Sequence, residues 1–337
     1  FIVNSGNMYS SIDGSLTGIN YASNVAMQKV FAANNGGQSL GSTPNDGLVY
    51  GDKMYVVVDG SNTVEVINKK TMQRIKQIKT TELLGAAEGK SPRHIIAGNG
   101  HIFFTTYGGY VAAVDTVNFK LTAKYKVGSY PEGLAGYASS IVANSDYAKG
   151  HGNISIINLG TGEVETRNVE GINNPQKVFI NNGNVYILDW VYYEGEYPNS
   201  VEKGESAIKY LAGNKATKVT DAYYASMLNG KLYIISNPYA VAKYSVCDLN
   251  SNPYQGTTTP LNLSEGVFSP AGIDVDPATG EIFVLSYNQG ENGYADYYSN
   301  GYVKRYSKNG SYMYSYDTGV GPCAVFFNVG VKTILDN

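Results

Sequence analysis

The chain has 337 residues, of which 16% are charged, and its formal net charge is −3. It contains no basic run, which makes nucleic acid a poor partner. No apolar stretch approaches the ~20 residues that a membrane-spanning helix needs. The 39 Gly and 30 Tyr favour many tight turns joined by β-strands, because Tyr fits the half-buried surface of a sheet.

One pattern recurs along the chain: a Pro, one or two polar residues, an apolar strand, a tight turn and a second strand. Six copies begin at Pro44, Pro92, Pro131, Pro175, Pro270 and Pro322, and a seventh, near Asp221, lacks the Pro. A period of roughly 40–50 residues with four strands per repeat is typical of a β-propeller. Because Pro cannot donate to a ladder of hydrogen bonds, we expect it at the entrance of each first strand.

The N-terminal blade lacks the first strand of the repeat at the start of the chain. Its strands are expected at residues 1–4, 15–19 and 25–30, and its missing first strand is expected at residues 324–327. A C-terminal strand that completes the N-terminal blade removes two open sheet edges. The second blade reads most clearly, and its four strands are expected at residues 47–50, 54–58, 63–67 and 74–78.

The sequence therefore predicts an all-β fold, a seven-bladed β-propeller with four-stranded antiparallel blades, as one domain over residues 1–337. Blade 1 takes residues 1–42 plus 322–330, and blades 2 to 7 take residues 43–90, 91–129, 130–173, 174–220, 221–268 and 269–321. Six or eight blades remain alternatives, because blades 4 and 6 match the pattern least well.

The two ends of the strands differ in sequence. We call the strands of a blade A to D. Connections A–B and C–D lie at one end, the turn end, and connections B–C and D–A lie at the other, the loop end. Tight Gly turns dominate the turn end. The loop end carries the long segments 144–151, 190–206 and 287–301, and exposed loops on a rigid scaffold are where function concentrates.

Aromatic side chains around polar ones at the loop end suit a bulky, flat, polar ligand. The residues expected to bind it are Asp46, Arg93, His94, Tyr107, Glu132, Tyr147, Gln176, Trp190, Tyr192, Tyr223, Tyr239 and Tyr287. The alternative is that these tyrosines only pack the loops, since Tyr is common throughout the chain.

No catalytic residue, metal ligand or cofactor is expected. The three histidines lack metal-ligand spacing, and neither a nucleophile elbow nor a phosphate-binding loop is present. Asp46, His94 and Glu132 follow successive anchor prolines, so a metal-dependent hydrolase or lyase stays an alternative. Cys247 and Cys323 lie in expected strands two repeats apart, and we expect free thiols there.

Two stretches carry a resemblance to a known family. Residues 1–7 with 14–16, and residues 51–58 with 61–67, resemble Bacteroidetes cell-surface propellers of the YncE-like, DUF5074 group. The resemblance covers nearly the whole chain, although the Asn-Glu-Gly start typical of that group is Asn4-Ser5-Gly6 here. It concerns the fold more than the ligand, and no binding residue is carried over from it.

That group includes BtuG-like lipoproteins, which capture cobalamin and pass it to a TonB-dependent outer-membrane transporter. The resemblance implies an exported, non-enzymatic protein at the cell surface, with a corrinoid as its small-molecule ligand and such a transporter as its partner. Any signal or lipid anchor would precede Phe1, and contact with the membrane would be through that anchor alone. The alternative is a protein- or glycan-interaction scaffold, and a monomer is the expected state.

Overall fold

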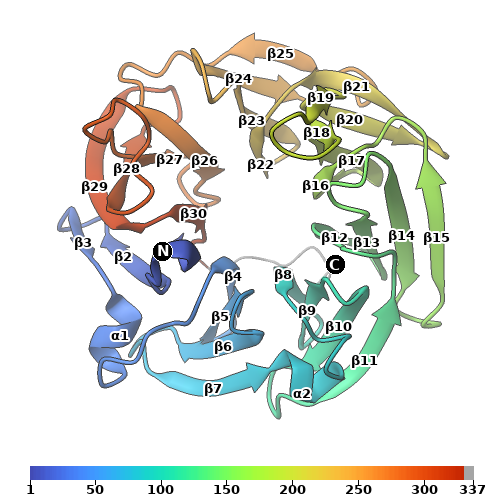
Figure 1. Cartoon of the computed structure of the whole chain (residues 1–337), viewed down its shortest axis with the longest axis horizontal. Coiled ribbons are helices and arrows are strands. Elements are labelled where there is room, and N and C mark those ends of the chain that lie inside the picture. Colours follow the sequence, from blue (N-terminus) through green and yellow to red (C-terminus); the bar gives the residue numbers. More distant parts are fainter. Residues whose placement is uncertain (330–337) are drawn as a thin grey trace. The chain divides into compact units, whose positions relative to one another are not determined.

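The structure is a computed structural model that describes residues 1–329. The expected domain over residues 1–337 and the closing segment 322–330 both end outside the described residues. Within them, seven four-stranded antiparallel sheets and one two-stranded sheet are present (Figure 1). The all-β, seven-bladed propeller is therefore confirmed.

The chain divides into two compact units, and each is described by itself. Unit 1 contains Phe1–Lys79, Tyr224–Val246 and the described residues from Thr259 onward, and unit 2 contains Thr80–Tyr223 and Cys247–Thr258. The sheet of β22 (Tyr224–Leu228), β23 (Lys231–Ser236), β24 (Lys243–Asp248) and β25 (Thr257–Pro260) has strands in both units.

Unit 1 holds three complete sheets. The first is β30 (Pro322–Val325), β1 (Ile2–Asn4), β2 (Ser15–Asn20) and β3 (Val25–Met27). The second is β4 (Pro44–Tyr50), β5 (Lys53–Val58), β6 (Thr63–Asn68) and β7 (Arg74–Lys79). The third is β26 (Ser269–Val275), β27 (Ile282–Tyr287), β28 (Asn300–Tyr306) and β29 (Tyr312–Val320).

Unit 2 also holds three. The first is β8 (Pro92–Gly98), β9 (His101–Thr106), β10 (Tyr110–Asp115) and β11 (Leu121–Lys126). The second is β12 (Leu134–Tyr137), β13 (Ser140–Ser145), β14 (Gly152–Asn158) and β15 (Val164–Val169). The third is β16 (Pro175–Asn181), β17 (Asn184–Asp189), β20 (Ala207–Ala212) and β21 (Lys215–Asp221), with the hairpin β18 (Tyr192–Glu194) and β19 (Val201–Lys203) inserted after β17.

Short helices occupy connections at the loop end. They are η1 (Met8–Ser10), α1 (Val30–Asn34) and α2 (Thr80–Leu84). The prediction of a strand over residues 25–30 was wrong at its C-terminal end. Strand β3 stops at Met27, and Lys29 takes a left-handed φ of 52° before α1. Val30 and Phe31 are buried, as expected for apolar residues, but they belong to the helix α1 and not to a strand. No helix of the described chain is long and apolar enough to cross a membrane.

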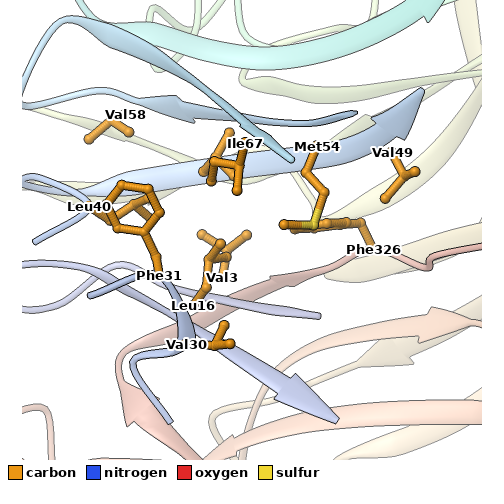
Figure 2. Packing of buried hydrophobic residues seen from close by; sticks show 11 residues of the cluster. Val3, Leu16, Val30, Phe31, Leu40, Val49, Met54, Val58, Ile67 and Phe326 are labelled. Atoms are coloured by element: carbon orange, nitrogen blue, oxygen red, sulfur yellow. The ribbon is translucent and has the colours of Figure 1, made fainter. Parts of the chain in front are cut away.

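The first sheet is completed by the C-terminal strand. Ile2 pairs with Val325 and Val3 with Ala324, and the amide of Phe326 donates to the carbonyl of Phe1 over 3.0 Å. The Phe326 ring stacks on the Phe1 ring, with 5.3 Å between centroids. Figure 2 shows Phe326 beside Met54 in the core that the first two sheets share. The strand begins two residues earlier than the expected 324–327, at its anchor Pro322.

A bulge follows the anchor proline in several A strands. The register shifts between Pro44 and Asp46 and between Pro92 and Ile95, and β16 and β26 shift in the same place. The residue before the proline has a positive φ at Thr43 and Ser91. A bulge redirects the side chains next to it and is common beside functional sites. The same bulge therefore recurs at the loop end of several sheets.

Both cysteines are free thiols. Cys247 is buried on β24, and Cys323 is half-buried on β30.

Replacing Phe326 by Ala tests the closure of the first sheet. Phe326 is 5% exposed, and removing a buried Phe ring costs about 3–5 kcal/mol. Urea unfolding followed by circular dichroism should show that loss in the free energy of unfolding. The matched control is Phe268→Ala, because Phe268 is 43% exposed and should change stability by under ~0.5 kcal/mol. Equal effects from the two variants would contradict the closure described here.

Candidate functional site

The structure divides the twelve expected ligand-binding residues between the units. Asp46, Tyr239 and Tyr287 belong to unit 1. Unit 2 contains the other nine, which are Arg93, His94, Tyr107, Glu132, Tyr147, Gln176, Trp190, Tyr192 and Tyr223. Those nine lie at the loop end of three neighbouring sheets, so unit 2 carries the candidate site.

Glu132 is the centre of the first group. It follows Pro131 at the entrance to β12, and it is only 4% exposed. Arg93, from the start of β8, donates from Nη2 to Glu132 Oε1 over 2.7 Å and from Nε to Oε2 over 3.0 Å. The hydroxyl of Tyr107 donates to Oε2 over 2.7 Å, and His94 Nε2 lies 3.7 Å from Oε1. The carboxylate is therefore bound from three side chains.

Neighbouring strands also fix the backbone of Glu132. The side-chain oxygen of Asn144, at the end of β13, accepts from the amides of Glu132 and Gly133 over 3.2 and 2.7 Å. The Thr105 hydroxyl, on β9, donates to the Glu132 carbonyl over 2.8 Å. Asn144 and Thr105 are both fully buried. The position of this carboxylate is thus set by the sheets rather than by a mobile loop.

The negative charge of the Glu132 carboxylate is stabilised by its neighbours. Burial alone would raise its pKa, but the charge of Arg93 and hydrogen bonds from His94 and Arg93 outweigh burial and lower the pKa to about 2. Burial, with the nearby Glu132 charge, raises the pKa of Tyr107. Tyr107 therefore keeps its proton and remains the donor. Both carboxylate oxygens of Glu132 are hydrogen-bonded within the protein, so Glu132 holds Arg93 and Tyr107 in place as a frame for the site.

Aromatic rings lie around this ion pair. The Arg93 guanidinium carbon is 4.8 Å from the centre of the Tyr107 ring. Tyr107 stacks on Tyr147 at 6.0 Å and meets Tyr130 edge-on at 5.4 Å. Lys149 Nζ lies 4.3 Å from the centre of the Tyr130 ring, and Tyr130 is 42% exposed. The frame thus carries a surface of rings and one cation.

Sequence reasoning missed two members of this surface. Tyr130 precedes the anchor Pro131, and Lys149 lies inside the long segment 144–151. Tyr130 has a left-handed φ of 48°, which is rare for an aromatic residue. The sequence did carry a signal for Tyr130, namely its position directly before an anchor proline. Thr43 and Ser91 hold the same position in earlier repeats and have the same left-handed φ.

A second aromatic group lies at the end of β17. The Trp190 ring stacks on Tyr223, with 4.3 Å between centroids and 19° between planes, and its Nε1 donates to the Tyr223 carbonyl over 2.6 Å. Tyr192 begins β18, and a Cβ added to Gly150 would lie 2.6 Å from its ring. Gly150 therefore allows the loop before β14 to pack against Tyr192.

Asn174 joins the two groups. Its side-chain oxygen accepts from the amide of Ala148 over 2.8 Å, and its Nδ2 donates to the Val191 carbonyl over 2.7 Å. Gln176 is buried and donates to that same oxygen over 2.8 Å. Asp189, fully buried in an ion pair with Lys209 at 2.7 Å, accepts from the Asn174 amide over 2.7 Å. Gln176 is thus part of the support.

Six ring-bearing residues follow one another along this loop end, and we call them the aromatic belt. They are Tyr107, Tyr130, Tyr147, Trp190, Tyr192 and Tyr223. All are half-buried except Tyr130, which is exposed. The belt offers ring faces and hydroxyls, which two ion pairs with buried carboxylates, Arg93–Glu132 and Lys209–Asp189, hold in place. Such a surface can bind flat or apolar groups without first having to become ordered.

The three expected residues of unit 1 have different surroundings. Asp46 lies at the bulge of β4, where its Oδ1 accepts from the Gly47 amide over 2.8 Å. Tyr287 ends β27 and meets Tyr297 edge-on at 4.7 Å. Burial, helped by the neighbouring Cys323, raises the pKa of Tyr287. Tyr239 is 72% exposed.

Among residues 1–329, no group of three or more His, Cys, Asp or Glu side chains is placed to share a metal ion. His151 lies 3.2 Å from Asp146 as an exposed partner, and His101 begins β9.

The chain belongs to the family described as a domain of unknown function, DUF5074, which matches residues 1–327. No curated protein is similar to it in sequence. Among solved structures it is similar to hydrazine synthase of Kuenenia stuttgartiensis, with 16% identity over 80% of this chain and 86% of that one and a TM-score of 0.60.

Two further structures share the fold at low identity. A hypothetical selenium-binding protein from Sulfolobus tokodaii is 13% identical over 80% of this chain and 76% of its own, with a TM-score of 0.56. The computationally designed Ika8 protein is 10% identical over 83% of this chain and 88% of its own, with a TM-score of 0.54. At these identities the similarities show the fold alone.

Replacing Glu132 by Gln tests the frame beneath the belt. At neutral pH, removing one partner of a buried ion pair should lower the free energy of unfolding by about 3–5 kcal/mol. Folding lowers the pKa of Glu132 from 4.5 to about 2, so its stabilisation is complete above pH 4.5 and is lost as the pH falls toward 2. The stability gap between wild type and variant should therefore shrink over that range in urea unfolding.

The control for this experiment is Glu196→Gln, since Glu196 is exposed. Its stability difference from wild type should stay near zero at every pH. A gap for Glu132→Gln that does not change with pH would contradict the stabilised charge.

Proposed function

We propose that this member of the DUF5074 family is a binding protein that captures a bulky, flat small molecule on the aromatic belt of unit 2, without chemical turnover. The observation that carries the proposal is the belt itself, six ring-bearing residues at one loop end. They are held by the half-buried Arg93 with the buried Glu132 and by the buried pair Lys209–Asp189. Rings supply contact area at low entropy cost, and their polar tips orient a ligand.

The composition of the belt favours a ligand with both flat and polar parts. Lys149 is exposed and lies over the Tyr130 ring, so it can meet carbonyl or anionic groups beside a ring face. Tyr147 and Trp190 present half-buried rings on either side of the Asn174 link. A single small polar molecule would leave most of that area unused.

Within this proposal the first ligand to test is cobalamin or a related corrinoid. A corrinoid is large, has flat faces and carries amide arms, which matches the ring faces and polar tips of the belt. The resemblance to BtuG-like proteins supports the same choice. It also supports export to the cell surface through a lipid anchor and delivery of the ligand to a TonB-dependent outer-membrane transporter.

A second candidate function is protein recognition by the β18–β19 hairpin. It exposes Tyr193 at 60%, Tyr197 at 92% and Val201 at 54%, and clustered exposed apolar groups mark interaction sites. If the hairpin docks on the transporter, Tyr193→Ser with Tyr197→Ser should abolish that complex in a surface plasmon resonance assay and leave ligand affinity unchanged. Unchanged transporter binding would remove the hairpin from the interface.

Calorimetric titration of cobalamin tests the ligand proposal. Trp190→Ala or Tyr192→Ala should weaken binding by about 1–3 kcal/mol, because each removes a ring from the contact surface. Trp190 is the single Trp of the chain, so quenching of its fluorescence reports directly on the belt.

The matched control is Tyr137→Ala. Tyr137 is 47% exposed at the turn end of β12, in the same sheet but away from the belt, so its loss should leave affinity unchanged. No heat with any corrinoid would remove that ligand class. Binding that the belt variants leave intact would move the site elsewhere.

A further inference from the structure

Unit 1 contains a cavity that none of the twelve expected residues lines. Its volume is about 240 Å³. Its walls come from residues 12–14 before β2, Ser15 and Leu16 at the start of β2, residues within 29–40 between β3 and β4, and Asn300, Gly319 and Val320. All of these belong to unit 1. Pockets for drug-sized ligands occupy roughly 300–1,000 Å³, so this cavity is suited to a smaller molecule.

The floor of the cavity is apolar. Leu16, Phe31 and Leu40 line it and are 0%, 1% and 2% exposed. Figure 2 shows all three in the cluster that contains Val3. Ile12, Ala32 and Val320 also line the cavity and are half-buried, so they keep apolar surface that a ligand can contact.

The walls are fixed by hydrogen bonds. The Gly14 amide donates to the Gly41 carbonyl over 2.8 Å. The side chain of Asn35 donates to the carbonyls of Phe31 and Met72 over 2.8 Å and accepts from the Arg74 amide over 2.7 Å. The segment that carries α1 is thereby tied to the neighbouring sheet, and the cavity is preformed.

Gly319 keeps room for the Ser15 hydroxyl. A Cβ at Gly319 would lie 2.5 Å from Ser15 Oγ. That oxygen accepts from the side-chain nitrogen of the fully buried Asn4 over 3.2 Å, which leaves the Ser15 proton available for donation at the wall of the cavity.

Two opposite charges also line the cavity. Asp13 and Lys29 are exposed, and within residues 1–329 neither side chain has a hydrogen bond or an ion pair. Charged side chains at one opening that do not pair with each other can each take a ligand group of opposite sign.

We propose that this cavity binds a small zwitterion with an apolar body, such as a free amino acid with an aliphatic or aromatic side chain, or a short apolar peptide. The ammonium group meets Asp13. The carboxylate meets Lys29 and the Ser15 hydroxyl. The apolar side chain rests on Ile12, Ala32 and Val320. The site is independent of the aromatic belt, which lies wholly in unit 2.

Calorimetry with the full chain tests this site. L-leucine and L-phenylalanine should bind, whereas leucinamide, which lacks the carboxylate, and N-acetyl-leucine, which lacks the ammonium, should bind at least about tenfold more weakly. A titration with leucyl-leucine distinguishes the two kinds of ligand. Tighter binding than that of leucine assigns the site to peptides, and weaker binding assigns it to free amino acids.

Variants locate the site. Asp13→Asn and Lys29→Gln should each weaken leucine binding about tenfold. Both residues are exposed, so the variants should keep the wild-type circular dichroism and the wild-type response to cobalamin. Lys308→Gln, at the turn end between β28 and β29, should change nothing. No binding of either zwitterion, or binding of leucinamide or N-acetyl-leucine as tight as that of leucine, would overturn the proposal, whatever the result with cobalamin.

Discussion

The pairing of β30 with β1 is the interaction on which the remaining structure depends. Without it, β1 would be an open edge strand, with unpaired backbone groups that invite pairing with other chains. The same pairing brings Phe326 onto Phe1 and into the core around Met54. The fold is therefore secured by a contact between residues 325 positions apart in sequence, while most other ladders join neighbouring strands of the chain.

Stable sheets allow the loop ends to be irregular. In unit 2, the bulge after Pro92 and the left-handed φ of Tyr130 bring Arg93 and Glu132 together. This pair supports the half-buried rings of Tyr107 and Tyr147 and the exposed ring of Tyr130. Lys209 and Asp189 do the same beneath Asn174. Tyr107 and Trp190 serve both purposes, because each donates a hydrogen bond within the site and also contributes a ring to the belt. A binding surface of this kind gains affinity because little of it must be ordered when a ligand arrives.

The sequence predicted the sheets well because their signals are local and repeated: a Pro at each entrance, a Gly turn and an apolar strand. It was less informative where contacts join distant repeats. Arg93 and Glu132 were chosen one by one from the residues that follow the anchor prolines, and their ion pair across 39 positions is a contact that no periodic pattern shows. The helix at Val30 was missed because its two apolar residues also fit a strand. The cavity of unit 1 was missed because Asp13, Lys29 and Ser15 recur in no other repeat.

A structure of the protein bound to cobalamin, determined by crystallography or electron microscopy, would test the central claim most directly. We expect density for the corrin ring against Tyr147 and Trp190, at the loop end of unit 2, with Glu132 still bound to Arg93. Ligand density in the cavity of unit 1 or at the turn end of the sheets, or an empty belt at saturating ligand, would contradict the claim.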